Sequence, residues 1–591
     1  MTVFLIAAAL VAPSAQADGI NPFSVRVGKD QTIDSRPIYS EKQTLTRSVA
    51  AGDTLRFAYT IPHEILHSEK ASYVVRVTLR SNKGKSVLFE KTLSPRTNVA
   101  DRGWHSETVS LGAFAGENVE IRFSSFHADG AGDAPPAVWA GVRVGNFHRK
   151  PGELNVVLIS LDTLRADRLG AAGYRRPTSP EIDSLAKKAV YFPHAVSQAT
   201  WTKPAHMALF SSVYPSINGS ETRPGMPGFG RVPDRFPLLT EVLKGHGYLT
   251  QAFTSDVFVS ERFGFDRGFD DFSEATGLDG ERVFANATEW LKHHADEKFF
   301  LFVHTYQVHA PYRHDTFVKD NMTDQERVDA QYDSEVRIAS KLVGDIVSRL
   351  KSLGLEKDTL IVLISDHGDS LGNHGLKGHG CSLYDELVLV PLMFSLPQRL
   401  QPRRLDDLNV ELIDVFPTIC DLLEITPPAG LMGRSLKPLL LGGERPSETL
   451  SVSEVLPSTR PRRSEPTDAD SEFAETSRYR LRSIRWSGSG RYKLIFGAGF
   501  AGNVEPDRGA IRLGSAWQAI RQAHGVQLFD LTTDPGEQRN IAAEKPDIVA
   551  KLQAKLLDRI SSNAPPVASA QEGGEIKIDG TLSEQLRALG Y

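Results

Sequence analysis

The stretch NVVLISLD, residues 155–162, decides the fold of most of this 591-residue chain. Seven mostly apolar residues run without alternation up to the aspartate, which is the pattern of a β-strand buried on both faces. Similar runs, FFLFVHTY at 299–306 and TLIVLISD at 359–366, are separated by helical patterns at 281–294 and 324–350. Strands that alternate with helices predict an α/β fold, a mostly parallel sheet flanked by helices.

The segments on either side of this pattern predict further domains. Short alternating strands such as TLRFAYT at 54–60 and SYVVRVTL at 72–79 predict a β-sandwich of jelly-roll type over residues 20–146, with Trp104 and Trp139 in its core rather than stacked on a sugar. The α/β catalytic domain is expected over 153–450. Two paired strands, LRSIRW and RYKLIF, and a last helix then predict a small α+β subdomain over 451–562, followed by a tail at 563–591.

Composition narrows the class of protein. Hydrophobic residues at 40 %, charged residues at 24 % and a formal net charge of -5 are ordinary for a globular chain, and they give no sign of nucleic-acid binding. Two cysteines, Cys381 and Cys420, exclude a disulfide framework, and Cys381 is interpreted as a packing residue.

The N-terminal residues 1–17 run from an apolar stretch into the tripeptide AQA. This pattern predicts a secretory signal peptide and hence a periplasmic or secreted protein, with a buried apolar strand as the alternative. No later segment has the roughly 18 continuous apolar residues of a transmembrane helix.

Polar residues follow two of the buried strands, at the place where a parallel sheet binds ligands. Asp162 comes directly after the first strand, and Asp366 with His367 after the third. Each aspartate alone would be interpreted as a helix cap. Together with Thr202 the three residues form a plausible set of metal ligands, and the imidazole favours zinc or manganese over calcium.

Thr202 begins the segment TKPAHMALFSS, in which a proline two residues on marks the first turn of a helix. The hydroxyl could be a simple N-cap, or it could be a nucleophile activated by a metal at an anion-binding helix terminus. His309 and His379, in loops after buried strands, could hold a second metal, steady an anionic group or protonate a leaving oxygen. His374 and Lys377 are weaker candidates.

These motifs together resemble the sulfatase family of the alkaline phosphatase superfamily. The resemblance rests on NVVLISLDTLRADRLG, the T-x-P-x-H segment with ALFSSVYP, H-x-P-Y, and SDHGDSLGNHGLKGHG. It covers residues 153–440, and LFDLTTDPGEQRNI at 528–541 resembles the family's C-terminal subdomain. The resemblance does not extend to the N-terminal sandwich.

The departures from the family pattern are informative. Formylglycine-dependent sulfatases carry C/S-x-P-S-R, whereas the aligned residues here run from Thr202 to His206 as TKPAH. Oxidation of a threonine would give a ketone, so formylglycine is not expected. Where those sulfatases bind calcium with two adjacent aspartates and an Asp-Asn pair, this chain has Asp162-Thr163 and Asp366-His367.

The altered residues resemble superfamily members that form a phosphothreonine, such as nucleotide phosphodiesterases and phosphoethanolamine or lipoteichoic acid transferases. This resemblance implies Thr202, His206, His309 and His379 as catalytic residues, with Asp162, Thr202, Asp366 and His367 around a metal. The second metal of the nucleotide enzymes needs an aspartate where this chain has Thr305, so a second metal is not assigned.

Three hypotheses follow for the function. The first is a metal-dependent hydrolase or transferase acting through Thr202 on a phosphate ester, a phosphodiester for preference, in a small molecule, a glycan or a lipid headgroup. The second is a sulfatase that works without formylglycine. The third is a non-catalytic glycan-binding protein.

Overall fold

The computed structural model describes residues 44–562, with gaps at 62–71, 96, 99–100, 102–104, 130–136, 223–228, 232, 256, 276–278, 457–478 and 500–525. It also describes short pieces between 21 and 39, and residues 576 and 583–584. The expected signal peptide, Trp104 and most of the expected tail lie outside the described residues. The chain divides into two compact units, Met1–Phe147 and His148–Tyr591.

The first unit is built from two antiparallel sheets. One has the strand order β1 (Asn21–Pro22), β4 (Pro37–Tyr39), β11 (Val138–Gly145), β6 (Thr54–Thr60) and β9 (His105–Ser110); the other has β5 (Thr44–Ser48), β10 (Asn118–His127), β7 (Tyr73–Ser81) and β8 (Gly84–Leu93). A short pair, β2 (Val25–Arg26) and β3 (Thr32–Ile33), accompanies them.

Aromatic side chains from both sheets meet in the core of this unit. The ring of Phe123 on β10 lies 5.0 Å from that of Trp139 on β11 and 5.8 Å from that of Phe57 on β6. Trp139 is fully buried, which confirms its expected place in the core. Alternating burial along β10 puts one face of the strand inside, as the period of two residues requires.

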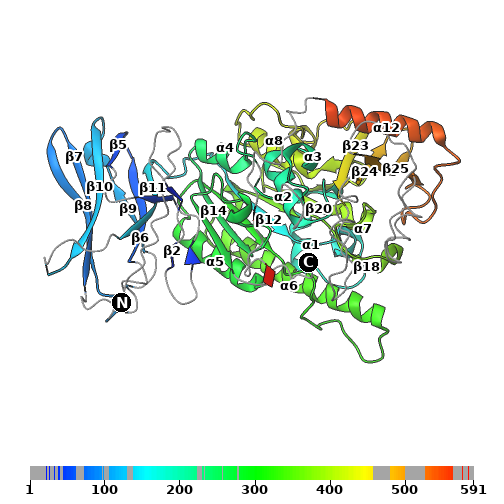
Figure 1. Ribbon diagram of the computed structural model, residues 1–591, viewed down its shortest axis with the longest axis horizontal. Helices are drawn as coiled ribbons and strands as arrows, with labels where there is room; N and C mark the ends of the chain where they lie inside the picture. Colours follow the sequence, from blue (N-terminus) through cyan, green and yellow to red (C-terminus); the bar gives the residue numbers. More distant parts are fainter. Residues whose placement is uncertain are drawn as a thin grey trace. The chain divides into compact units, whose positions relative to one another are not determined.

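The second unit contains the predicted sheet (Figure 1). Its path is β15 (Asp271–Ala275), β14 (Leu249–Ser255), β16 (Phe299–Thr305), β12 (Asn155–Leu161), β17 (Thr359–Ile364), β20 (Leu389–Ser395), β13 (Val190–Val196) and β21 (Arg403–Arg404), and β22 (Val410–Glu411) also pairs with β13. The strands from β15 to β17 are parallel, and β20 runs against its two neighbours. The mostly parallel sheet is confirmed.

Helices cover both faces of this sheet, because the central strands are apolar on both. Val156 and Leu158 of β12 belong to one core with α2 (Thr202–Ser211), α4 (Leu239–Gly245) and α8 (Val415–Leu422). Val157 and Ile159 belong to the other core, with α1 (Pro180–Ala186), α5 (Gly280–His293) and α6 (Asp324–Ser352). The shorter helices are α3 (Pro215–Asn218), α7 (Asp385–Val388) and α9 (Lys437–Leu440).

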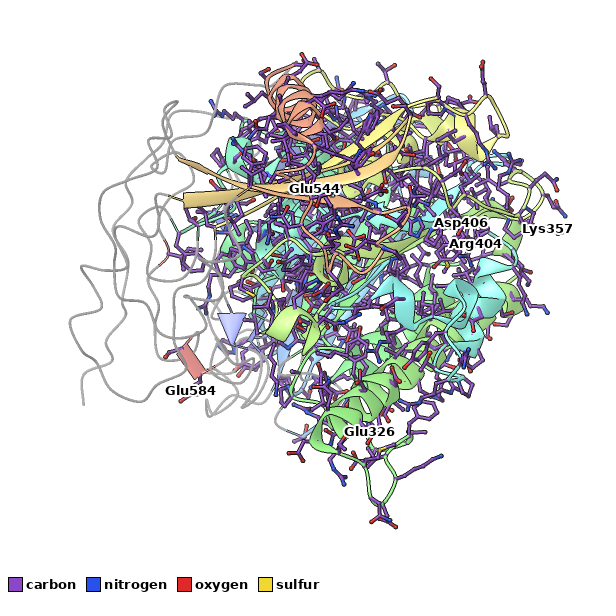
Figure 2. The ribbon with its side chains drawn as sticks, turned by 90° about the vertical axis from the view of Figure 1, so that its right-hand side faces the viewer. Glu326, Lys357, Arg404, Asp406, Glu544 and Glu584 are labelled. Carbon is purple, nitrogen blue, oxygen red and sulfur yellow. The ribbon has the colours of Figure 1, made fainter. Side chains whose placement is uncertain are left out.

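Local signals set the helix starts. The Thr323 hydroxyl and the Glu326 side chain form a capping box at α6, and Asp279 accepts from the Arg282 N–H at the start of α5 at 2.9 Å. Figure 2 shows charged side chains such as Glu326 and Lys357 on the outside of this unit.

The second unit also contains a smaller antiparallel sheet, built from its last strands. It has the order β23 (Thr449–Val455), β24 (Tyr479–Ser487), β25 (Arg491–Gly499) and β26 (Gln527–Asp530), and α12 (Pro546–Ser561) packs on it. The predicted pairing of LRSIRW with RYKLIF is confirmed. Side chains of this sheet belong to the same core as α2, so it is packed against the large sheet. Among the helices described, none is long and apolar enough to cross a bilayer.

Candidate active site

The site forms where three neighbouring parallel strands end. Asp162 follows β12, and its backbone N–H donates to the Thr305 carbonyl at the end of β16 at 3.0 Å. Asp366 and His367 follow β17, the other neighbour of β12. The Thr163 N–H donates to Asp366 Oδ1 at 3.3 Å, which joins the two strand ends directly. The sheet therefore brings together the residues predicted from the strand-end rule.

Thr202 is the first residue of α2, and its hydroxyl reaches this group. Oγ1 donates to Asp162 Oδ2 at 3.0 Å and lies 3.5 Å from His367 Nε2. Trp201 is the N-cap and offers no side-chain oxygen, so among the described residues no side chain caps the N-terminus of α2 next to the Thr202 hydroxyl. Such a terminus favours negative charge. Thr202 is fully buried.

The orientation of His367 is fixed by the backbone. Its Nδ1–H donates to the Gly368 carbonyl at 2.8 Å, so Nε2 is the nitrogen that faces Thr202. Position 368 has to be glycine, because a Cβ there would come within 2.0 Å of the Glu386 carbonyl oxygen. Burial is the main cause, and the charge of neighbouring His379 the second, that hold the pKa of His367 well below its usual range. The ring is therefore neutral and able to accept.

Asp162 and Asp366 form a buried pair of carboxylates. Burial is the main cause that raises the pKa of Asp162 to about 7. Burial, and then the charge of Asp162, raise the pKa of Asp366 well above its usual range. Two like charges in a buried site favour protonation unless a cation compensates them.

The residues present fit a divalent cation. Ligand atoms of Asp162, Asp366 and His367 lie within 4.8 Å of one another. Asp162 Oδ1 and Asp366 Oδ2 are buried and accept no hydrogen bond among the described residues, which leaves two anionic oxygens for a cation. In the described part of the chain, this is the one such group of carboxylates, histidines or cysteines.

His206 lies four residues after Thr202 on α2, next to the Thr202 backbone. Its Nδ1–H donates to the Thr202 carbonyl at 3.0 Å, and Nε2 accepts from the Ser160 hydroxyl at 2.9 Å. Both ring nitrogens therefore have partners within the fold. Nδ1 also lies 3.4 Å from Asp366 Oδ2, so the ring borders the carboxylate pair, and the catalytic role expected from the sequence stays a prediction.

His304, at the end of β16, was not predicted. It is fully buried, and both of its ring nitrogens lack a hydrogen-bond partner among the described residues. Nε2 lies 3.7 Å from Asp162 Oδ2, and the ring stands perpendicular to that of His206, with centroids 4.8 Å apart. Burial lowers the pKa of His304 to about 3, so the ring is neutral beside the Asp162 carboxylate.

The structure also brings His309 and His379 to the site. The ring centroid of His379 lies 4.6 Å from that of His367 and 5.0 Å from that of His309. Burial, and then His379, lower the pKa of His309 to about 4. His309 belongs to a loop that the buried Glu335 carboxylate holds, since Glu335 accepts from Gln307 Nε2 at 2.6 Å and from His314 Nδ1 at 2.8 Å.

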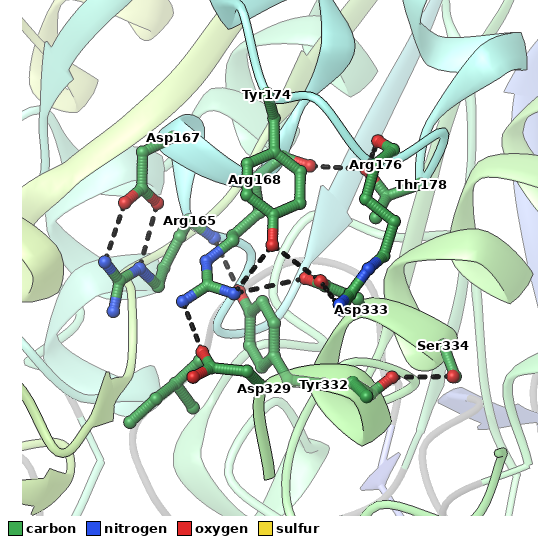
Figure 3. Close-up of polar contacts among 12 residues, drawn as sticks. Arg165, Asp167, Arg168, Tyr174, Arg176, Thr178, Asp329, Tyr332, Asp333 and Ser334 are labelled. Atoms are coloured by element: carbon green, nitrogen blue, oxygen red, sulfur yellow. Dashed lines mark hydrogen bonds and ion pairs between the residues drawn. The ribbon is translucent and has the colours of Figure 1, made fainter. Parts of the chain in front are cut away.

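A network of arginines and aspartates supports the segment after Asp162 (Figure 3). Arg165 pairs with Asp167, and Arg168 reaches Asp329 and Asp333 on α6. The network faces a strained residue: Thr163 has φ of 58°, which is costly for a β-branched side chain. The Tyr332 hydroxyl donates to the Thr163 carbonyl at 2.8 Å and so holds it in that conformation.

The weaker candidates lie outside this group. His374 stacks on Tyr384 with centroids 3.8 Å apart and donates from Nδ1 to Glu386 at 2.8 Å, and its Nε2 lies 3.2 Å from the Glu537 carbonyl in the C-terminal subdomain. Lys377 is exposed. Cys381 and Cys420 are not joined by a disulfide.

Comparison with known proteins supports the family expected from the motifs. Residues 154–425 match the sulfatase family model. Delta 4,5-hexuronate-2-O-sulfatase from Bacteroides thetaiotaomicron is 22 % identical over 497 residues, covering 74 % of this chain and 94 % of its own length. Arylsulfatase K from Xenopus laevis is 28 % identical over 40 % of this chain, which spans only 38 % of that relative.

Solved structures support the fold. Phosphonate monoester hydrolase of Agrobacterium radiobacter superposes with a TM-score of 0.53 at 20 % identity, over 70 % of this chain and 96 % of that one. At this identity the likeness concerns the fold alone. The sulfatase family match over residues 154–425, the sulfatase relatives and the site at the strand ends together support a sulfatase-like ester hydrolase.

Proposed function

We propose that this protein cleaves a phosphate ester, a phosphodiester for preference, through the hydroxyl of Thr202. The observation that carries the proposal is the position of that hydroxyl, 3.0 Å from Asp162 Oδ2 and 3.5 Å from His367 Nε2 at the start of a helix. A hydroxyl becomes an effective nucleophile when a base or a metal removes its proton.

Asp162, Asp366 and His367, with Thr202, would hold one divalent cation. The nitrogen ligand favours zinc or manganese over calcium. When bound, such a cation lowers the pKa of a hydroxyl and neutralises negative charge on a phosphate oxygen. Metal analysis of the purified protein tests this assignment.

The remaining residues bind and orient the ester. Asp162 Oδ2 accepts a hydrogen bond from the Thr202 hydroxyl and fixes the direction of Oγ1. The first-turn N–H groups of α2 offer hydrogen bonds and a positive dipole to the anion. His309 and His379 would contact the transferring group or the leaving oxygen, a role that the short distances between their rings and that of His367 support. Thr202 Oγ1 would form a bond to phosphorus and displace one alcohol of the diester, and water or a second alcohol would then attack phosphorus and break its bond to Oγ1.

The charge of the site favours a monoanionic ester. Asp162 and Asp366 carry two negative charges once ionised, and one divalent cation offsets them. The basic side chains described near the site are engaged elsewhere. Burial lowers the pKa of Lys203 to about 7, and its amine contacts the Thr222 carbonyl and the Phe229 ring. The Arg165 guanidinium contacts Asp167 and Asn373. A dianionic phosphomonoester would meet little positive charge, so a monoanionic diester fits better.

A sulfate ester is also monoanionic, and the sulfatase relatives favour it as the second candidate. The chemistry of threonine opposes it. A formylglycine hydrate can expel sulfate by reverting to the aldehyde, whereas a sulfated threonine needs a further displacement at sulfur. We therefore rank the phosphodiester first.

The test compares rates on a bis-aryl phosphate, an aryl phosphate and an aryl sulfate, using metal-loaded wild type and Thr202→Ala. The proposal expects the diester to turn over fastest and its turnover to vanish in Thr202→Ala. A marked preference for the sulfate would instead support the second candidate. Unchanged activity in Thr202→Ala would remove Thr202 from the mechanism.

A further inference from the structure

Asp369 links two loops of the site through its two carboxylate oxygens. The side chain is buried, two residues after His367. Oδ1 accepts from His379 Nδ1–H at 3.2 Å, and Oδ2 accepts from the Tyr312 hydroxyl at 3.0 Å. One carboxylate therefore ties the loop after β17 to the loop after β16.

Each of these loops carries a histidine of the site. Tyr312 comes three residues after His309, and the His309 and His379 rings lie 5.0 Å apart between centroids. His379 also contacts the ring of His367, 4.6 Å away. The spacing of the three histidines therefore depends on a carboxylate that itself does not belong to the metal-binding group.

The backbone of Asp369 is held as well. Arg165 Nη1 donates to its carbonyl at 3.0 Å and to Asn373 Oδ1 at 2.9 Å. Arg165 is buried, and Asp167 fixes its other guanidinium nitrogens. The anchor therefore runs from the segment after Asp162 to the loop that carries His379.

We propose that Asp369 is a positioning residue. Its carboxylate accepts a hydrogen bond from His379 Nδ1–H and so orients that ring, and its hydrogen bond with Tyr312 keeps the loop of His309 next to His379. This inference rests on the proposed function of the site. A carboxylate that accepts from Nδ1 fixes the tautomer and rotation of the ring, so Nε2 is the nitrogen presented to a substrate. Both oxygens of Asp369 already have donors, which sets it apart from Asp162 and Asp366.

The experiment uses the full-length, metal-loaded protein and the variants Asp369→Asn, Tyr312→Phe and the double variant. Asp270→Asn is the matched control: Asp270 is another buried carboxylate, which accepts from the Thr250 N–H at 2.9 Å and pairs with Lys244 on α4. For each protein we would measure kcat, KM, bound metal and the urea midpoint, on whichever ester the wild type turns over fastest.

Asp369→Asn is expected to lower kcat by about 10- to 100-fold with little change in KM, as loss of a supporting hydrogen bond does in such sites. Tyr312→Phe removes one of the two bonds and should lower kcat by up to about 10-fold. Because the two residues share one interaction, the double variant should lose less than the product of the single losses. Bound metal should stay at the wild-type level, and the urea midpoint should fall no further than in Asp270→Asn.

Three results would overturn the inference. Full activity in Asp369→Asn would show that the carboxylate positions nothing, and loss of bound metal in that variant would make Asp369 part of the metal site. An equal loss of kcat in Asp270→Asn would make the effect one of general stability. Failure of the proposed function would show differently, as turnover that survives in Thr202→Ala.

Discussion

Removing the metal should make the stability of this protein fall as the pH rises. Asp162 and Asp366 lie buried side by side, and burial is the main cause that raises the pKa of each. A carboxyl whose pKa is higher in the folded state than in the unfolded chain stabilises the fold at low pH. That stability is lost as the pH rises from about 4 to about 7, where Asp162 ionises in the fold.

The size of the effect follows from the shift. Asp162 moves from 3.8 to about 7, roughly 3 units, and each unit corresponds to about 1.4 kcal/mol. The metal-free protein should therefore lose at most about 4 kcal/mol of unfolding free energy through this group. A bound cation needs both carboxylates ionised, so its stabilising effect should grow over the same interval.

The assay is urea unfolding of chelator-treated protein at about pH 4 and about pH 7.5, with Asp366→Asn measured beside wild type. Asp366→Asn removes the second charge, so it should be more stable than metal-free wild type at the higher pH and about equal to it at the lower. With metal present the order should reverse, because a ligand is missing. A difference between the two proteins that does not change with pH would refute the reasoning.

Three further changes give separate tests. Lys493→Met leaves buried Glu537 without its ion-pair partner and should lower the unfolding free energy by about 3–5 kcal/mol. Urea unfolding measures this loss, and a loss below about 1 kcal/mol would contradict the prediction. Trp139→Ala should destabilise the first unit by about 3–5 kcal/mol, seen as an earlier transition in calorimetry, and an unshifted transition would count against its place in the core. Thr202→Ser keeps the hydroxyl and should retain kcat within about 10-fold, whereas Thr202→Val should be inactive. Equal rates for the two variants would show that the hydroxyl is not the nucleophile.

The central strands could be predicted from the sequence because they are apolar on both faces. The runs at 155–161, 299–305 and 359–364 coincide with β12, β16 and β17. The strand β14, LTQAFTS, gave no such signal, since four of its seven residues are polar although all are buried. Two of them have hydrogen-bond partners, since Thr250 Oγ1 donates to the Gly268 carbonyl at 2.8 Å and Gln251 Nε2 to the Ala252 carbonyl at 2.9 Å, and a single sequence does not reveal those partners.

The candidate metal ligands were predictable for a related reason. Parallel strands end at one edge, so Asp162, Asp366 and His367 had to meet there. The position of His304 at the site was not predicted, because this histidine lies within an apolar run and has no other ligand-type residue at a characteristic spacing. Asp369 stood in the DHGD motif beside the predicted ligands, but its function depends on Tyr312, 57 residues away in the sequence. Contacts of that kind are set by the fold.

The most direct test of the central claim is to stop the reaction with acid during turnover of a phosphodiester and to map the modified residue by mass spectrometry of the peptide containing residues 198–212. The claim that Thr202 is the nucleophile predicts a phosphoryl adduct on Thr202 that forms at least as fast as the enzyme turns over. In Thr202→Ser the adduct should lie on the side chain at the same position. Turnover with no adduct at position 202, together with unchanged rates in Thr202→Ala, would contradict the claim.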